Sequence, residues 1–186
     1  MSFGEYFHSV DVSFLHFANL SLAHPWNDVV FKLWTSEVPW FVMTAFFFGQ
    51  TAYRRQWRAF TLLLWLGATI GVSDGVAAQL IKPWVGRLRP CRIEDLVRVV
   101  DGCAGSWGFP SNHAANGAAF AVFWLLWKGP RPGLIAVACA VTVGFSRIYL
   151  GVHYPSDVIG GFCFGGSLGA LSYYLYTRTL ARRWAA

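Results

Sequence analysis

The sequence predicts an all-α membrane protein, a bundle of about five transmembrane helices preceded by an amphipathic N-terminal helix. Of its 186 residues, 55% are hydrophobic and only 13% are charged, whereas a soluble domain carries about a quarter of charged residues. The apolar residues gather in runs that approach the length of a bilayer span. The basic residues gather at the ends of these runs. Together these observations predict a single integral-membrane domain over residues 1–186.

Residues 1–24 form the first element, and they mix apolar with polar side chains. Apolar residues recur there at every third or fourth position: Phe3, Phe7, Val10, Phe14 and Phe17. That spacing is typical of an amphipathic helix lying in the membrane interface. A first transmembrane helix is the alternative, and it raises the number of spans to six. The segment lacks a basic start followed by an apolar core, so it does not resemble a cleavable signal peptide.

Five apolar runs follow the N-terminal segment. The first covers residues 38–49 and extends back into residues 25–37, which gives the about 20 residues that a bilayer requires. The other four cover residues 60–80, 110–127, 134–145 and 158–176. The fourth is barely long enough, which predicts a thinned membrane or a site sunk below the headgroups. The fifth carries small residues at every fourth position, which favours close helix packing: Gly161, Gly165 and Gly169.

The basic residues predict the orientation of the bundle. One group follows the first, third and fifth runs: Arg54, Arg55, Arg58, Lys128, Arg131, Arg178, Arg182 and Arg183. By the positive-inside rule these connections face the cytoplasm. The polar stretches at residues 82–113 and 146–157 then share the opposite side, the periplasm or exterior of a bacterial inner membrane. No basic run interleaved with aromatic residues is present, which argues against a nucleic-acid partner.

Three polar motifs lie on that outward side. They carry cations, hydroxyls, histidines and a carboxylate: Lys82, Arg87 and Arg89, then Ser111, Asn112 and His113, then Ser146, Arg147, His153 and Asp157. Arginine binds phosphoryl oxygens by charge-assisted hydrogen bonds. A histidine attacks phosphorus when a carboxylate holds its other ring nitrogen. If Pro155 opens a helix, Asp157 falls in its first turn, within reach of His153. A zinc site is the alternative use of the two histidines and Asp157.

In order, the motifs are Lys-x6-Arg-Pro, Pro-Ser-Asn-His and Ser-Arg-x5-His-x3-Asp. This pattern resembles the type 2 phosphatidic acid phosphatase family, which shares its site with the vanadium haloperoxidases. The resemblance covers residues 82–157 and the flanking hydrophobic pattern. It departs at one position, because Asn112 stands where the family usually has glycine. Asparagine tolerates unusual backbone angles better than most residues, so we expect the turn to survive with a changed pocket wall.

The resemblance implies a lipid-phosphate phosphatase that uses no cofactor and no metal. His153 attacks phosphorus and forms a phosphohistidine, Asp157 orients His153, and His113 protonates the leaving oxygen and then activates water. Five residues are implied to bind the phosphate: Lys82, Arg89, Ser111, Asn112 and Arg147. These cations are expected to do the work that a metal ion does in other phosphoryl-transfer enzymes. The expected partners are a lipid-phosphate substrate and the membrane lipids. The oligomeric state stays open.

Three further residues are candidates for supporting roles: Asp74, Ser146 and Arg87. Asp74 lies inside the second apolar run, where a carboxylate is costly and usually functional. We expect it either to pair with a motif cation or to face a water-filled vestibule. Arg87 either adds a fourth cation or meets lipid headgroups.

The four cysteines fall into two pairs. Cys91 and Cys103 bracket the polar loop on the outward side, in the oxidising compartment, so we predict a disulfide between them. Two free thiols are the alternative. Cys139 and Cys163 lie inside apolar runs, where a free cysteine behaves as a small apolar residue.

The motifs do not choose among lipid phosphates. We favour undecaprenyl diphosphate, with phosphatidylglycerophosphate, phosphatidic acid and the 1-phosphate of lipid A as alternatives. A protein that binds or flips lipid phosphates without turnover is a second class of function, although the two histidines and Asp157 favour an enzyme. A haloperoxidase is a third, and the membrane setting argues against it.

Overall fold

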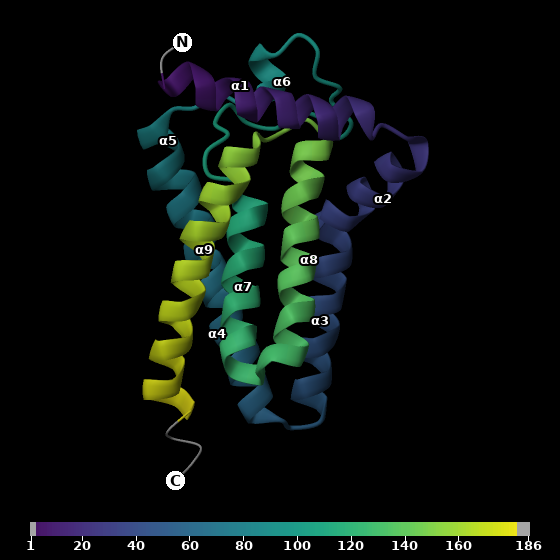
Figure 1. The fold of residues 1–186 in the computed structure, drawn as a ribbon. Helices are drawn as coiled ribbons and strands as arrows, with labels where there is room; N and C mark the ends of the chain where they lie inside the picture. Colours follow the sequence, from purple (N-terminus) through teal and green to yellow (C-terminus); the bar gives the residue numbers. More distant parts are fainter. Residues whose placement is uncertain (1–2, 182–186) are drawn as a thin grey trace.

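A computed structural model describes residues 3–181, and helices make up most of this range (Figure 1). Five long helices run along one axis: α3 (Glu37–Tyr53), α4 (Trp57–Val76), α7 (Asn112–Lys128), α8 (Pro130–Tyr149) and α9 (Pro155–Tyr176). Four shorter helices lie near one end: α1 (Phe3–His16), α2 (Pro25–Thr35), α5 (Lys82–Val85) and α6 (Pro90–Ile93). Three π-helical turns extend α1, α4 and α9: η1 (Phe17–Ser21), η2 (Ala77–Ile81) and η3 (Thr177–Ala181). The basic residues expected at positions 182 and 183 lie outside the described range.

The expected all-helical membrane bundle is confirmed. Three helical stretches are long and apolar enough to cross a membrane: Trp57–Val85, Pro130–Tyr149 and Pro155–Leu180. The remaining two expected spans, α3 and α7, have 17 residues each. At a rise of about 1.5 Å per residue such a helix is somewhat shorter than the hydrocarbon core. Length and composition therefore identify three of the five expected spans.

Two helix boundaries differ from the sequence prediction. The first span does not extend back through residues 25–37, because Ser36 adopts an extended conformation and separates α2 from α3. The fourth span is not short, because α8 begins at Pro130 and has 20 residues. Proline at the first helical position needs no hydrogen-bonded amide, so the proline-rich turn is compatible with this early start. Arg147 consequently belongs to the last turn of α8.

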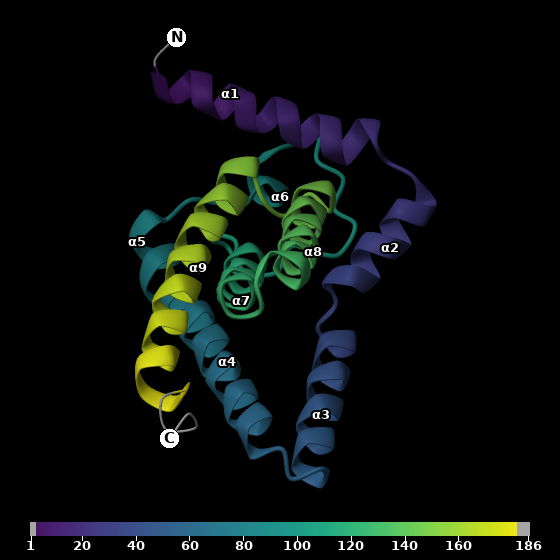
Figure 2. The same ribbon diagram turned by 60° about the horizontal axis from the view of Figure 1, so that its bottom comes forward.

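α7 is the central helix of the bundle, and it packs against α9, α8 and α4 (Figure 2). The expected small-residue face of α9 is confirmed, because it allows the two backbones to touch. A Cβ atom added to Gly165 would lie 1.9 Å from the backbone oxygen of Ala115. One added to Gly169 would lie 2.3 Å from the backbone oxygen of Ala119. Side chains at these glycines would force α9 away from the helix that begins at the second motif.

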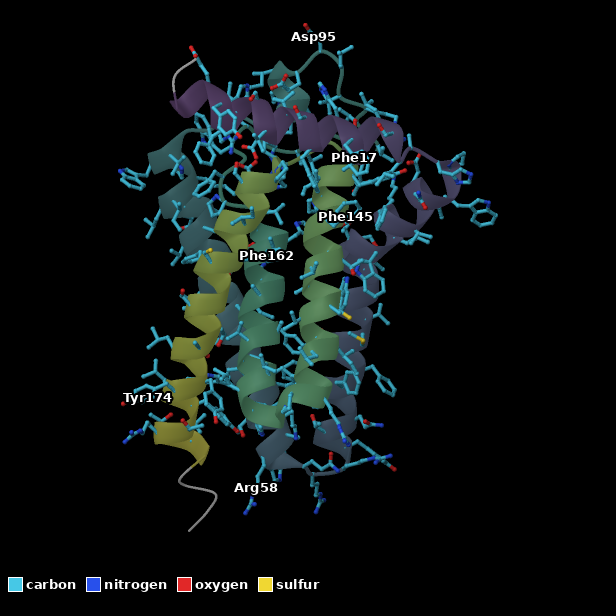
Figure 3. The ribbon with its side chains drawn as sticks, viewed as in Figure 1. Phe17, Arg58, Asp95, Phe145, Phe162 and Tyr174 are labelled. Carbon is cyan, nitrogen blue, oxygen red and sulfur yellow. A yellow bond between two sulfur atoms is a disulfide. The ribbon has the colours of Figure 1, made fainter. Side chains whose placement is uncertain are left out.

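The two ends of the bundle differ in what covers them. Arg58 lies at one end and Asp95 at the other (Figure 3). α1 crosses over the end that carries Asp95, roughly at right angles to the long helices (Figure 1). The three motif stretches occupy this same end, at α5, at the start of α7, and between the end of α8 and the start of α9. The fold thus brings residues from distant parts of the sequence together beneath α1.

Candidate active site

A cavity of about 420 Å³ lies where the three motifs meet. Seven of the residues singled out in the sequence line it: Asp74, Lys82, Arg89, Asn112, His113, Arg147 and His153. Three of the others, Ser111, Ser146 and Asp157, are fully buried near its wall. The helices therefore assemble the three motifs into one polar pocket in an otherwise apolar bundle.

His153 lies in the short loop between α8 and α9 and is only 1% exposed. Its Nδ1 atom lies 3.4 Å from Oδ2 of Asp157. The same oxygen accepts a hydrogen bond from the backbone amide of Tyr154 at 3.0 Å, in a capping box at the start of α9. The start of the helix thus fixes the carboxylate, and the carboxylate orients the imidazole. Nε2 of His153 lies 3.3 Å from Nη1 of Arg89.

The surroundings of His153 favour its neutral form. Burial, and next the positive charges of Arg89, Lys82 and Arg147, hold the pKa of His153 well below its usual value. With a proton on Nδ1, directed at Asp157, the lone pair of Nε2 is available for attack. Burial also lowers the pKa of Arg89, but a guanidinium group stays protonated in proteins.

The cations are held by backbone carbonyls rather than by acids. Nζ of Lys82 and Nε of Arg89 each donate to the backbone oxygen of Trp107 at 3.2 Å. Nε of Arg147 is buried and has no hydrogen-bond partner among the residues that the structure describes. An unsatisfied buried donor costs about 1–3 kcal/mol. A phosphate oxygen bound in the cavity would remove that cost.

The start of α7 supplies the second motif. Asn112 and His113 line the cavity, and Ser111 is the N-cap residue. Within the described range, Oγ of Ser111 is a buried atom without a hydrogen-bond partner. The backbone amide of Ser111 donates to the backbone oxygen of Asp157 at 3.0 Å, which ties the start of α7 to the start of α9. The amides at this N-terminus favour an anion.

Within the described residues Asp74 forms no ion pair with a motif cation, although it interacts electrostatically with Lys82. Its Oδ1 atom accepts hydrogen bonds from the side-chain amides of Asn112 at 2.7 Å and Asn116 at 3.2 Å. Because α4 packs against α7, these amides reach the carboxylate from the facing helix. The alternative expectation, that Asp74 faces a polar cavity, agrees with its position in the cavity wall.

Ser146 and Arg87, the other two candidates for supporting roles, have different surroundings. Oγ of Ser146 donates to the backbone oxygen of Val143 at 2.6 Å within α8, so this hydroxyl is used inside its own helix. Arg87 contacts two carboxylates. Its Nη1 atom donates to Oδ1 of Asp157 at 2.9 Å, and its Nη2 atom donates to Oδ2 of Asp11 at 2.6 Å. Arg87 therefore supports Asp157 from the side away from His153.

Sequence reasoning missed Asp11, which lies on α1 and is 8% exposed. Besides Arg87, its carboxylate accepts a hydrogen bond from the backbone amide of Ser156 at 2.9 Å. The signal was present in the sequence: Asp11, Leu15 and Asn19 recur at every fourth position, opposite the aromatic stripe. All three are buried, so this polar face of α1 is the one that contacts the protein.

Cys91 and Cys103 form a disulfide, with their Cα atoms 6.1 Å apart. The bridge closes the loop that follows Arg89. Nη2 of Arg92 donates to the backbone oxygen of Cys103 at 3.1 Å in the same loop. Arg89 is thus joined to a short, cross-linked segment rather than to a long free loop.

Comparisons with known proteins agree with this geometry. The chain is 33% identical over 185 residues to a lipid A 4'-phosphatase of Bacteroides thetaiotaomicron, covering 96% of this chain and 82% of that protein. It is 40% identical over 122 residues to a lipid A 1-phosphatase of Rhizobium etli, covering 61% of this chain and about half, 52%, of that protein. A crystal structure of a transmembrane PAP2-type phosphatidylglycerolphosphate phosphatase from Bacillus subtilis matches with a TM-score of 0.68 at 29% identity, over 94% of this chain and 88% of that one.

The family match covers the same part of the chain as the site. The model of the PAP2 superfamily matches residues 60–180, which include all three motifs. Since this is more than half of the chain, and since one relative matches along nearly its whole length, the resemblance drawn from the motifs is confirmed: the chain belongs to the PAP2 superfamily.

Proposed function

We propose that this protein is a membrane-embedded lipid-phosphate phosphatase that works through a phosphohistidine on His153. The observation that carries the proposal is the cavity itself. It places Lys82, Arg89 and Arg147 around the buried imidazole of His153, whose Nδ1 atom faces Asp157. The unpartnered Nε of Arg147 is a donor prepared for an anion. A non-catalytic lipid-binding protein would need the cations but not the oriented pair of His153 and Asp157.

The first step transfers the phosphoryl group to the protein. Nε2 of His153 attacks phosphorus in line, the phosphorus–oxygen bond to the lipid breaks, and His113 gives a proton to the leaving oxygen. The cations neutralise the charge on the phosphoryl oxygens as it develops. Asp157 stabilises the positive charge that forms on the imidazole.

The second step releases inorganic phosphate. His113, now neutral, takes a proton from water, and the water oxygen attacks the phosphorus. The phosphorus–nitrogen bond breaks, and His153 returns to its neutral form. Both histidines end the cycle as they began it, so the net reaction is hydrolysis of the phosphate ester.

For the substrate we favour a phosphomonoester on a glycolipid headgroup. The relative that matches along nearly the whole chain is a lipid A 4'-phosphatase, and a shorter match is a lipid A 1-phosphatase. Undecaprenyl diphosphate, favoured from the sequence, remains a prediction that the same assay tests. Both lipids present their phosphate at a membrane surface, as a site beneath α1 requires.

In the membrane we place α3 and α7 as further spans, because they extend between the same two ends of the bundle as α4, α8 and α9 (Figure 1). The end of the bundle with Arg58 faces the cytoplasm of a bacterial inner membrane, and the cavity faces outward. α1 lies in the outer interface, because one side of it exposes apolar residues: Tyr6, Phe7, Val10, Phe14 and Phe17. The outward side is also where a disulfide between Cys91 and Cys103 persists.

Phosphate release by purified protein in detergent tests this function. We expect release from lipid A monophosphate or another lipid of the panel, which holds undecaprenyl diphosphate, phosphatidylglycerophosphate and phosphatidic acid. His153→Ala should reduce the rate to background with an unchanged thermal unfolding temperature. In the wild-type protein, mass spectrometry after an alkaline quench should locate a phosphoryl group on His153.

Ser167→Ala is the matched control, because this exposed hydroxyl on α9 donates only within its helix, to the backbone oxygen of Cys163. It should leave the rate unchanged. Undiminished phosphate release by folded His153→Ala would rule out the phosphohistidine mechanism. A wild-type protein that binds the lipids but releases no phosphate would instead indicate the binding or flipping function.

A further inference from the structure

The wall of the cavity carries negative as well as positive groups. Besides the cations and histidines, three carboxylates line it: Glu37, Asp74 and Asp101. Asp101 lies 3.4 Å from Nζ of Lys32 and so has a cationic partner. Asp74 interacts electrostatically with Lys82, so part of this negative charge balances the cations. The carboxylates are also hydrogen-bond acceptors for any part of a ligand that carries donors.

Asp74 and two asparagines form the most organised part of this acidic side. Oδ1 of Asp74 accepts both side-chain amides, from Asn112 at 2.7 Å and from Asn116 at 3.2 Å. Each asparagine thereby turns its amide group in a defined direction. Their own acceptors, Oδ1 of Asn112 and Oδ1 of Asn116, are buried and find no hydrogen-bond donor in the described part of the chain.

Asn112 lines the cavity, and Asn116 lies one helical turn further along α7, behind this wall. Unsatisfied buried acceptors at the wall of a polar cavity indicate a missing donor. Two amide oxygens and a carboxylate cannot be satisfied by a phosphate, which has acceptors only when it is fully ionised. Hydroxyl and N–H groups can satisfy all three. The chemistry of this cluster thus fits a polyol or a sugar, rather than an alkyl chain.

The position and the chemistry of the cluster together indicate which part of the substrate meets it. Asn112 is followed directly by His113, which gives its proton to the leaving oxygen in the proposed mechanism. The cations that bind the phosphoryl group come from the other motifs, on α5, on α8 and in the loop before α6. Asp74 also lies near enough to Lys82 to interact with its charge, so position alone does not assign the cluster. An ionised phosphate has no donor for the free amide oxygens, so they suit the leaving group rather than the phosphoryl group.

We propose that Asp74 and Asn112, with Asn116 holding Asp74 from behind the cavity wall, form a subsite that recognises hydroxyl or N–H donors on the leaving group, close to the scissile bond. The subsite selects lipids whose phosphate is attached to a sugar or glycerol unit with a free donor. It selects against lipids whose phosphate is attached directly to diacylglycerol or to a polyprenyl chain. This inference rests on the proposed phosphatase function and names the class of substrate for that site.

The test compares two lipids that differ in this donor. Phosphatidylglycerophosphate has a free hydroxyl on the glycerol unit that bears its terminal phosphate, and phosphatidic acid with the same acyl chains has none. We expect Asp74→Asn, which keeps the volume but removes the charge, to lower the ratio of kcat/KM for the first lipid to that for the second by about tenfold, the typical effect of one charged hydrogen bond. The loss should lie mainly in KM, because the hydrogen bonds exist before the transition state.

A second variant guards against a folding defect at position 74. Asn116→Ala removes one acceptor and should shift the same ratio in the same direction. Asp95→Asn, on the exposed loop at the same end (Figure 3), is the matched control that removes a carboxylate outside the cavity and should leave the ratio unchanged. A lipid A monophosphate, with sugar hydroxyls beside the ester, should respond to Asp74→Asn as phosphatidylglycerophosphate does.

Two results overturn the inference. If Asp74→Asn and Asn116→Ala change kcat/KM by the same factor for both lipids, the cluster only supports the helix packing. If neither variant changes kcat/KM for either lipid, the cluster does not contact the substrate. Failure of the proposed function is distinguishable, because then the wild-type protein releases phosphate from none of the lipids.

Discussion

At the scale of single residues, His153 derives its reactivity from its neighbours. Asp157 lies 3.4 Å from one ring nitrogen and Arg89 lies 3.3 Å from the other. The two contacts act in opposite directions on the charge of the ring, and burial joins Arg89 in lowering the pKa of His153. Burial, and next the cations of the cavity, thus keep the imidazole neutral to a lower pH than in a free histidine.

This balance predicts how activity depends on pH. Protonated His153 cannot attack, so kcat/KM should fall as the pH drops through the pKa of His153 in the free protein. Because that pKa is lowered, we expect this acid limb to lie below pH ~6.5, the usual pKa of a histidine. Arg89→Gln removes the positive charge beside Nε2, raises the pKa of His153, and should move the acid limb to higher pH in addition to slowing the reaction.

Measuring the pH profile of kcat/KM for both proteins on one lipid controls for titration of the substrate phosphate, since that contribution is the same in both. An acid limb at the same pH in the two proteins would show that Arg89 does not set the charge of His153.

The motif residues could be predicted from the sequence because their order and spacing are characteristic, and because they come from stretches that all lie at one end of the bundle. The contacts of Asp11 and Asn116 could not. Asp11 meets Arg87 across 76 positions of sequence, and Asn116 meets Asp74 across 42. Such pairings depend on how α1 lies over the bundle and on which faces of α4 and α7 meet, and hydrophobic periodicity does not determine either.

At the scale of helices, α1 contacts the site with one side and exposes apolar residues on the other. Its apolar side is exposed, as Phe14 at 44% and Val10 at 50% show, while Asp11 on the opposite side contacts Arg87. Arg87 in turn contacts Asp157 and stacks over the ring of Tyr154 at 4.3 Å. The sequence predicted the amphipathic pattern of α1 from its aromatic spacing, but it assigned no function to its polar side.

From this contact we predict that Asp11→Asn slows catalysis without weakening substrate binding. Asp11 does not line the cavity, so it acts on His153 only by positioning Arg87 and Asp157. Removing a residue that orients a metal-bound histidine through a hydrogen bond typically lowers activity by about tenfold or more, and we expect a similar effect here. Steady-state kinetics should therefore show kcat reduced by roughly tenfold with KM nearly unchanged.

Ser9→Ala is the control on the same helix, because its hydroxyl is exposed and donates only to the backbone oxygen of Tyr6. It should leave kcat unchanged. If Asp11→Asn raised KM and left kcat intact, α1 would contribute to lipid binding rather than to the orientation of His153.

Helix boundaries were the least predictable feature at this scale. The break at Ser36 separates α2 from α3, which the sequence predicted as one span. The extended conformation of a single residue does not change the hydropathy of the segment, so hydropathy could not predict the break. The early start of α8 was missed because the apolar run begins only at residue 134, after Pro130 and Pro132, although proline also suits the first turn of a helix. The packing face of α9 was predictable, since its glycines recur at every fourth position and have no other use there.

At the scale of the whole molecule, the arrangement of charges and the arrangement of motifs agree. Arg58 and Asp95 lie at opposite ends of the bundle (Figure 3). The end near Asp95 carries α1, the disulfide and the cavity. Both the positive-inside rule and the disulfide favour the same orientation, with the cavity outward. These are independent arguments, because one uses the basic loops and the other uses the redox state of the compartment.

The orientation predicts which positions a reagent can reach from outside the cell. In a parent protein with Cys139→Ala and Cys163→Ala, which removes the two free cysteines, Asp95→Cys should react with a membrane-impermeant maleimide in intact spheroplasts. Arg58→Cys should react only after the membrane is permeabilised, so each variant is the control for the other. Both should retain phosphatase activity, since neither residue lines the cavity. Labelling of Arg58→Cys in intact spheroplasts, with Asp95→Cys protected, would reverse the orientation. The chemistry of the cavity would then act on lipids of the inner leaflet, and the disulfide between Cys91 and Cys103 would have to form in a reducing compartment.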